Sequence, residues 1–130
     1  MRKLIPVHYV PSLENGELLI DSDNRFDILY TMMFNTGLVS VCGGAFVEPG
    51  EITLKKKQPL RYSMITISGK RIFYMDMAAS DCTKKAVEIS AELRKREIPA
   101  DYFFFNSLRI SGTLIAANSC KLLCCYQANI

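Results

Sequence analysis

Cysteine is the residue type in this chain best suited to chemistry, because its thiolate is both a nucleophile and a metal ligand. The chain has five cysteines, an odd number without a CxxC pair or a regular spacing: Cys42, Cys82, Cys120, Cys124 and Cys125. In a strand, Cys120 and Cys124 would share one face while Cys125 points to the other, which does not suit a tetrahedral zinc ion. We therefore expect reduced, buried thiols in a cytoplasmic protein, with no metal and no cofactor.

Cys82 is the cysteine best placed for reactivity, because it falls in the first turn of a predicted helix, where the helix dipole lowers a thiol pKa. The only histidine, His8, is far away in the sequence, and a cysteine nucleophile usually needs a base as well. Cys82 also shares the apolar stripe of the helix with Ala86 and Ile89. Core packing is the favoured interpretation, and a cysteine-dependent enzyme that uses Cys82 is the second alternative function.

The junction between a predicted strand and this helix is a candidate ligand site. Helix amino termini expose unpaired N–H groups and a partial positive charge, so a phosphate or carboxylate could bind near Asp76, Ser80 and Asp81. Ser80 and Asp81 are also ordinary helix-capping residues, and Asp81 would itself occupy the positive end. Capping alone is the favoured interpretation.

Positive charge is concentrated in one stretch of the chain. The net charge is +3, yet residues 55–71 hold six cations and no acid. Aromatic residues between cations suit single-stranded DNA or RNA, because bases stack on the rings and phosphates pair with the cations. Nucleic-acid binding is therefore the first alternative function, although most charge runs are solvated turns or protect an edge strand. Its candidate residues are Lys55, Lys56, Lys57, Arg61, Tyr62, Lys70 and Arg71.

Three consecutive aromatic residues, Phe103, Phe104 and Phe105, give the leading functional hypothesis. In a strand, Phe104 must face away from its two neighbours, so one face of the sheet needs a second cover from a helix, a second subunit or a partner. We expect a protein partner or a homo-oligomer at this surface. Because no catalytic set is assembled, the sequence favours a small non-enzymatic binding or regulatory protein that acts through a macromolecular partner or self-association.

The elements that must position these residues are a series of short strands and two helices. A turn at residues 14–17 predicts a first hairpin, and capping residues at 21–24 precede a short, almost entirely apolar helix. Further strands are predicted at 38–42 and 45–47, with a turn at 48–51, and a strand opening at 52–56. The strands at 62–67 and 71–77 form a hairpin, a long helix covers 80–97, and strands follow at 102–110, 113–117 and 121–126.

We therefore predict an α+β fold for residues 1–130 as a single domain, with a mostly antiparallel sheet of about six to eight strands, one short helix and one long helix. The apolar last third should lie at the centre of the sheet. In the alternative, strands 71–77 and 102–105 lie side by side and parallel, and the long helix makes a βαβ core in a mixed sheet. No apolar run approaches the roughly 20 residues of a membrane helix, so we expect no membrane partner.

The stretch RIFYMDM followed by AVEISAELRKREIPADYFFF is similar to the anticodon-binding domains of class II aminoacyl-tRNA synthetases, which also have a strand, a helix and a second strand. The similarity covers about a quarter of the chain, and the flanking hairpins do not fit that family. It implies a strand–helix–strand unit and assigns no residue and no function.

Overall fold

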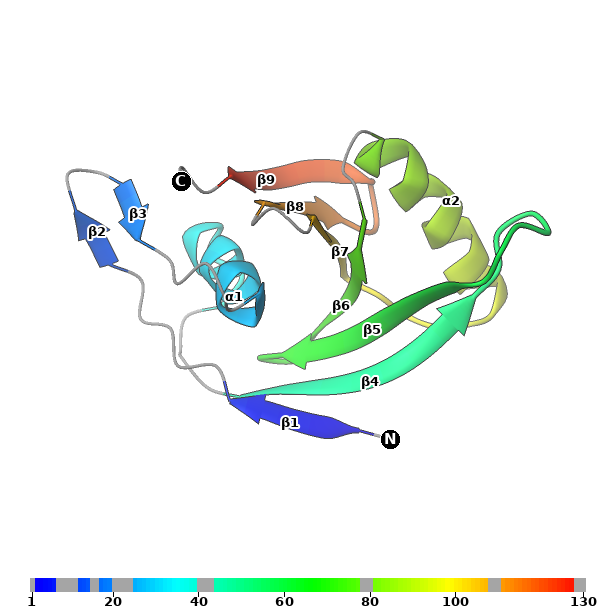
Figure 1. Cartoon of the computed structure of the whole chain (residues 1–130), viewed down its shortest axis with the longest axis horizontal. Coiled ribbons are helices and arrows are strands. Elements are labelled where there is room, and N and C mark those ends of the chain that lie inside the picture. The colour runs from blue at the N-terminus through cyan, green and yellow to red at the C-terminus, as the bar shows by residue number, and fades with distance from the viewer. Residues whose placement is uncertain are drawn as a thin grey trace.

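The computed structural model describes residues 2–6, 12–14, 17–19, 25–39, 44–77, 81–107 and 111–127. Seven strands form the main sheet in the order β1-β4-β5-β6-β7-β8-β9, while β2 and β3 form a separate hairpin (Figure 1). The elements are β1 (Lys3–Pro6), β2 (Ser12–Glu14), β3 (Glu17–Leu19), α1 (Arg25–Asn35), β4 (Gly44–Ile52), β5 (Leu60–Ile67), β6 (Lys70–Asp76), α2 (Cys82–Lys95), β7 (Tyr102–Ser107), β8 (Ser111–Ala116) and β9 (Lys121–Gln127).

The pairing of the strands confirms the predicted fold class. All neighbours in the main sheet are antiparallel except β6 and β7, which are parallel and are joined through α2. The mostly antiparallel sheet thus contains the βαβ unit of the alternative prediction. The expectation that the last third lies at the centre is wrong for β9, which is an edge strand, although β7 lies beside the central strand β6.

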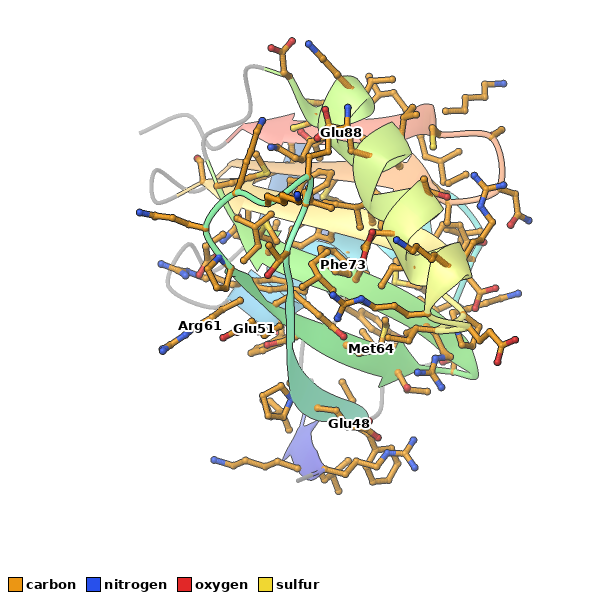
Figure 2. All side chains as sticks on the ribbon, turned by 90° about the vertical axis from the view of Figure 1, so that its right-hand side faces the viewer. Glu48, Glu51, Arg61, Met64, Phe73 and Glu88 are labelled. Carbon is orange, nitrogen blue, oxygen red and sulfur yellow. The ribbon has the colours of Figure 1, made fainter. Side chains whose placement is uncertain are left out.

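The two helices pack on opposite faces of the sheet. Seven consecutive residues of α1, from 27 to 33, are buried, because the strands curve around this helix (Figure 1). By contrast, α2 buries one stripe that includes Ala86, Ile89 and Leu93 and leaves its other side in solvent. Figure 2 shows Met64 and Phe73 on the face beside α2. Both helices therefore cover sheet faces whose apolar side chains alternate along the strands.

The three consecutive phenylalanines are covered within the chain, so their prediction as a partner surface is wrong. Phe103 and Phe105 lie in the core on the α2 side, whereas Phe104 lies in the core on the α1 side. All three are at most 1% exposed. A helix packs on each face of the sheet, and a helix was one of the three kinds of cover expected from the sequence.

One long strand, β4, covers both the short strand predicted at residues 45–47 and the turn predicted at 48–51. Of the other strand predicted, at 38–42, residues 40–42 lie outside the described residues. Pro49 lies inside β4, opposite Ser63 of β5, and β1 pairs with β4 only as far as Val47. A proline fits there because its donor-free nitrogen can point to the side that β1 leaves open. The predicted strand at 52–56 is instead a turn, in which Lys55 and Lys56 adopt left-handed φ angles of 47° and 59°.

Candidate functional site

A cleft opens where β5 and β6 stop pairing. Their ladder ends at the pair Ser63–Tyr74, beyond which residues 60–62 pair only with β4 and residues 75–76 only with β7. The two strands separate there, at the carboxyl end of β6. The cleft has a volume of about 1040 Å³, which matches the upper range of ligand-binding pockets.

Backbone groups of both strands point into this cleft. The amide of Met77 donates to the carbonyl of Asn106 on β7 at 2.9 Å. Since the groups of successive residues point to opposite sides of a strand, the N–H and C=O of Asp76 point toward β5. In the last pair of the ladder, Ser63 directs its backbone groups toward Tyr74 of β6. Arg61 is two residues earlier in β5, so its N–H and C=O point to the same side, toward β6. Arg61 and Asp76 would form the next bonded pair of the ladder, and the separation of the strands leaves them without it.

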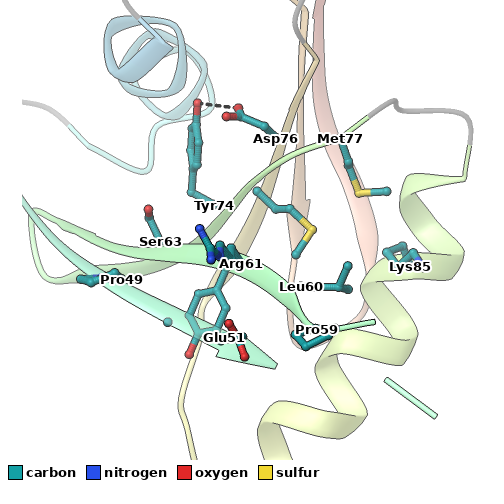
Figure 3. A pocket seen from close by; sticks show the side chains of 13 residues that line it. Pro49, Glu51, Pro59, Leu60, Arg61, Ser63, Tyr74, Asp76, Met77 and Lys85 are labelled. Carbon is teal, nitrogen blue, oxygen red and sulfur yellow. Dashed lines mark hydrogen bonds between the residues drawn. The ribbon is translucent and has the colours of Figure 1, made fainter. Parts of the chain in front are cut away.

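The side chains around the cleft are polar on one side and apolar on the other. Figure 3 shows Arg61, Ser63 and Tyr74 together at the cleft, with Met77 and Lys85 on the side of α2. Leu60 and Met75 also line it, on the α2 side. A ligand there would meet hydroxyl groups, a guanidinium and carboxylates along one side, and thioether and aliphatic groups with the ammonium of Lys85 along the other.

A set of hydrogen-bonded polar residues holds one wall of the cleft in place. Arg25 Nη1, at the start of α1, lies 2.6 Å from Asp76 Oδ2, and the Tyr74 hydroxyl donates to Asp76 Oδ1 at 3.2 Å. Asn106 Nδ2 donates to the same hydroxyl at 3.3 Å, and this asparagine is fully buried. The set ties α1, β6 and β7 together at the point where both parallel strands end.

Tyr74 is held in its neutral form by this environment. Its pKa is raised to about 12, mainly by burial and also by the negative charge of Asp76, while Asn106 and Arg25 act in the opposite direction. Arg25 has its own pKa raised by the carboxylate of Asp76. The phenol is therefore a hydrogen-bonding group at neutral pH and is not a base.

The two edges of the sheet form a second pair of candidate surfaces. Within the described residues, β1 pairs only with β4, and β9 pairs only with β8. β1 has four residues, ends at Pro6 and carries Lys3, whereas β9 has seven residues with the sequence KLLCCYQ. Leu122 of β9 is 51% exposed, and Cys125 is exposed as well.

Backbone geometry shows which amides face outward at each edge. Ala117 N donates to Asp101 O of the segment before β7, so the backbone N–H and C=O of Ala117 point toward β7. These groups change sides from one residue to the next, so those of Leu114, three residues earlier, point the other way, toward Cys124 of β9. Cys125 must then direct its N–H and C=O away from the sheet. The same reasoning applies at β1. Phe46 of β4 directs its backbone groups toward β5, so Leu4, which lies opposite Phe46, has no backbone hydrogen-bond partner in β4 and directs its amide outward.

The basic stretch at residues 55–71 does not form one patch. Lys55, Lys56 and Lys57 lie in the segment before β5, whereas Lys70 and Arg71 are the first two residues of β6, after the turn that follows β5. The eight residues of β5 separate the two groups by roughly 26 Å at about 3.3 Å per residue.

The two remaining members of the basic stretch lie at the cleft. Arg61 is exposed there. Tyr62 is half-buried, and its ring stacks on Phe73 at 4.5 Å and lies against Gly50, where a Cβ atom would collide with it. Phe73 and Gly50 therefore occupy part of the surface that a base would need for stacking.

Cys82 is buried beneath β9. Its exposed fraction is 8%, and burial raises the pKa of the thiol, as the neighbouring Cys125 and Asp81 also do, while Thr113 has the opposite effect. The expected packing role on the apolar stripe of α2 is confirmed. Thr113 Oγ1 of β8 lies 3.7 Å from Cys125 Sγ of β9, so small polar groups of these two strands meet beside Cys82.

The proposed ligands of the α2 amino terminus lie on different faces of the sheet. Asp76 faces α1 and is bonded to Arg25, while Asp81 precedes α2 on the opposite face, is exposed and makes no side-chain capping bond. Ser80 lies outside the described residues, as do His8 and Cys42. The structure therefore does not bring the described members, Asp76 and Asp81, together.

Several residues at these sites gave no recognisable signal in the sequence. Arg25, Ser63 and Asn106 belong to no motif, and only the position of Asn106 after three phenylalanines in a buried strand marks it as unusual. In the part of the chain that is described, no three His, Cys, Asp or Glu side chains gather as a metal ion would need, and no helix is long and apolar enough to cross a membrane. No family model matches the chain, and no curated protein or solved structure is significantly similar to it.

Proposed function

We propose that this chain is a non-enzymatic binding protein that acts through protein association at the outer edge of β9, with a second copy of itself as the first occupant. The observation that carries the proposal is the seven-residue apolar edge strand, which has β8 as its only strand partner among the described residues. An unprotected edge strand is a template for strand pairing. The basis is therefore the edge itself and not the phenylalanines, which are buried.

Two copies of β9 can pair antiparallel around a two-fold axis, which closes the assembly as a dimer. The exposed side chain of Leu122 would gain contacts in such a pair, and the outward N–H and C=O of Cys125 would gain bonds. At the other edge, Pro6 and Lys3 oppose the same reaction, since proline lacks a donor and lysine repels its own copy.

The test compares Cys125→Pro with Cys125→Ser by sedimentation over a wide range of protein concentration. Proline removes the outward N–H but leaves the bonds to β8, which come from the neighbouring residues, whereas serine keeps both. We expect the wild type and the serine variant to self-associate and the folded proline variant to stay monomeric. A wild-type monomer at the highest soluble concentration, or a proline variant that associates like the wild type, would overturn the proposal.

A second candidate function is binding of a polyanion such as RNA, and one contact favours it. Arg96 Nη1 donates to the carbonyl of Glu51 at 3.4 Å, which brings the end of α2 beside the end of β4. The exposed cations there come from the turn after β4 and from the end of the helix. They are Lys55, Lys56, Lys57, Arg94, Lys95 and Arg96.

Charge reversal of Lys55, Lys56 and Lys57 tests this second function, with reversal of Lys70 as the matched control at the far end of β5. Binding of single-stranded RNA should fall steeply with salt and be lost only in the triple variant. The absence of any retarded RNA at low salt, or equal loss in the control, would exclude it.

We also propose a cytoplasmic location, and we weigh the hypothesis of a cysteine-dependent enzyme. Four thiols are free among the described residues, at Cys82, Cys120, Cys124 and Cys125, which suits the reducing cytoplasm. The remaining hypothesis, a cysteine-dependent enzyme, receives no support at Cys82, because a buried thiol with a raised pKa is a poor nucleophile.

A further inference from the structure

We infer that the cleft between β5 and β6 binds an extended, acidic peptide segment of a partner protein. This site is separate from the β9 edge and does not depend on association there. It is formed by strands that belong to the interior of the sheet, where an end of the β5–β6 ladder is left open.

The backbone supplies the first argument. Arg61 and Asp76 face each other across the cleft as the next bonded pair that the ladder would have formed, and each presents an N–H and a C=O to it. An extended peptide satisfies such groups on two strands at once, because it also presents alternating donors and acceptors. A compact small molecule would satisfy fewer of them.

Charge supplies the second argument. Two cations, Arg61 and Lys85, line the cleft together with two carboxylates, Glu51 and Asp76. The Asp76 carboxylate is already bonded to Arg25 and Tyr74, whereas Arg61 and Lys85 form no ion pair within the described residues. Among the same residues, Glu51 forms no ion pair either and offsets one of these two cations, so one positive charge of the cleft is left without a partner. An acidic side chain of the peptide would pair with the guanidinium of Arg61.

The apolar wall supplies the third argument. Leu60, Met75 and Met77 lie on the α2 side of the cleft. Thioether side chains adapt to ligands of varied shape. In an extended peptide, alternate side chains point to opposite sides, so one residue can face Arg61 while the next faces the methionines. The expected ligand thus alternates acidic and apolar residues.

The test is a titration of the isotopically labelled protein followed through its amide resonances. The probe is a capped pentapeptide of alternating valine and glutamate, and the control is the same peptide with lysine in place of glutamate. We expect the amides of Arg61 and Asp76 to shift and saturate with the acidic peptide only. No shift in the cleft, or equal shifts with the lysine peptide, would overturn the inference.

Two substitutions of one residue separate the contributions of charge and backbone. Arg61→Gln removes the charge and keeps the N–H, and it should weaken binding about tenfold. Arg61→Pro removes the N–H as well, without affecting the bonds to β4, and should weaken binding by about a further fivefold. Equal affinity in the glutamine variant and the wild type would contradict the charge argument. Cys125→Pro should leave the titration unchanged, so failure at the β9 edge and failure at the cleft can be distinguished.

Discussion

The two edges of the main sheet differ in how well they resist pairing with another chain. β1 is short, ends at Pro6 and begins beside Arg2, whose guanidinium lies over the ring of Phe46 and forms an ion pair with Glu48. β9 is longer, and its only charged residue is Lys121, at its start. Natural sheets protect edges with short strands, proline and charge. The chain therefore protects one edge and leaves the other available, which is the physical basis of the proposed association.

The largest expected effect tests whether the interior of the sheet, and not either edge, holds the fold. Phe104→Ala should destabilise the protein by about 3–5 kcal/mol, because the ring is fully buried beneath α1 and its removal leaves a cavity. The matched control is Phe46→Ala beside β1, where the ring is 42% exposed, and it should cost less than about 1 kcal/mol. Urea denaturation measures both changes, and similar losses would mean that the edge carries as much of the stability as the core.

The buried core around Phe104 could be predicted from the sequence better than the edges of the sheet. Apolar periodicity predicted both helices and most strands, because burial on one face leaves a repeat in the sequence. Pro49 misled the prediction, since a proline inside a strand is acceptable only when its nitrogen faces an open side, and that depends on how far β1 extends. The cleft could not be predicted either, because the separation of β5 from β6 depends on the pairing of both strands with other neighbours.

The second prediction compares an exposed thiol on the open edge with a buried thiol below it. Iodoacetamide should modify Cys125 faster than Cys82 in the native protein, by about tenfold or more, since an opening that costs about 1.4 kcal/mol already gives that factor. Raising the pH increases the thiolate fraction of Cys82 only above the usual thiol range, because burial raises its pKa. Peptide mapping after timed quenching gives both rates, and selective early modification of Cys82 would contradict its assigned packing role.

The third prediction compares the two edges through the same substitution of one exposed leucine on each. Leu122 of β9 and Leu4 of β1 have exposed fractions of 51% and 56%, so they differ mainly in the strand that carries them. Leu122→Lys should weaken self-association about tenfold, because lysine on an edge opposes strand pairing. Leu4→Lys should have no effect on it. If sedimentation shows that the substitution on β1 is the damaging one, the roles of the two edges are reversed.

The smallest expected effect lies between the edges, at the polar wall of the cleft. Burial and Asp76 hold the pKa of Tyr74 at about 12, above the ordinary value of 10.0, so this tyrosine stabilises the fold below about pH 10 and loses that contribution as the pH rises toward 12. Asp76→Asn should lower the pKa of Tyr74, and the ultraviolet absorbance of the phenolate measures it. An unchanged or higher pKa in this variant would show that the carboxylate does not act on the phenol, and association at β9 should be unaffected throughout.

The most direct test of the association at β9 follows two backbone amides that point outward from opposite edges, those of Leu4 and Cys125. Amide hydrogen exchange, measured on the wild-type protein at low and at high concentration, reports whether either amide gains a partner. We predict that exchange at Cys125 slows as the concentration rises, while exchange at Leu4 stays the same. Exchange at Cys125 that does not change with concentration, or slowing at Leu4 instead, would contradict the assignment of β9 as the edge through which this protein associates.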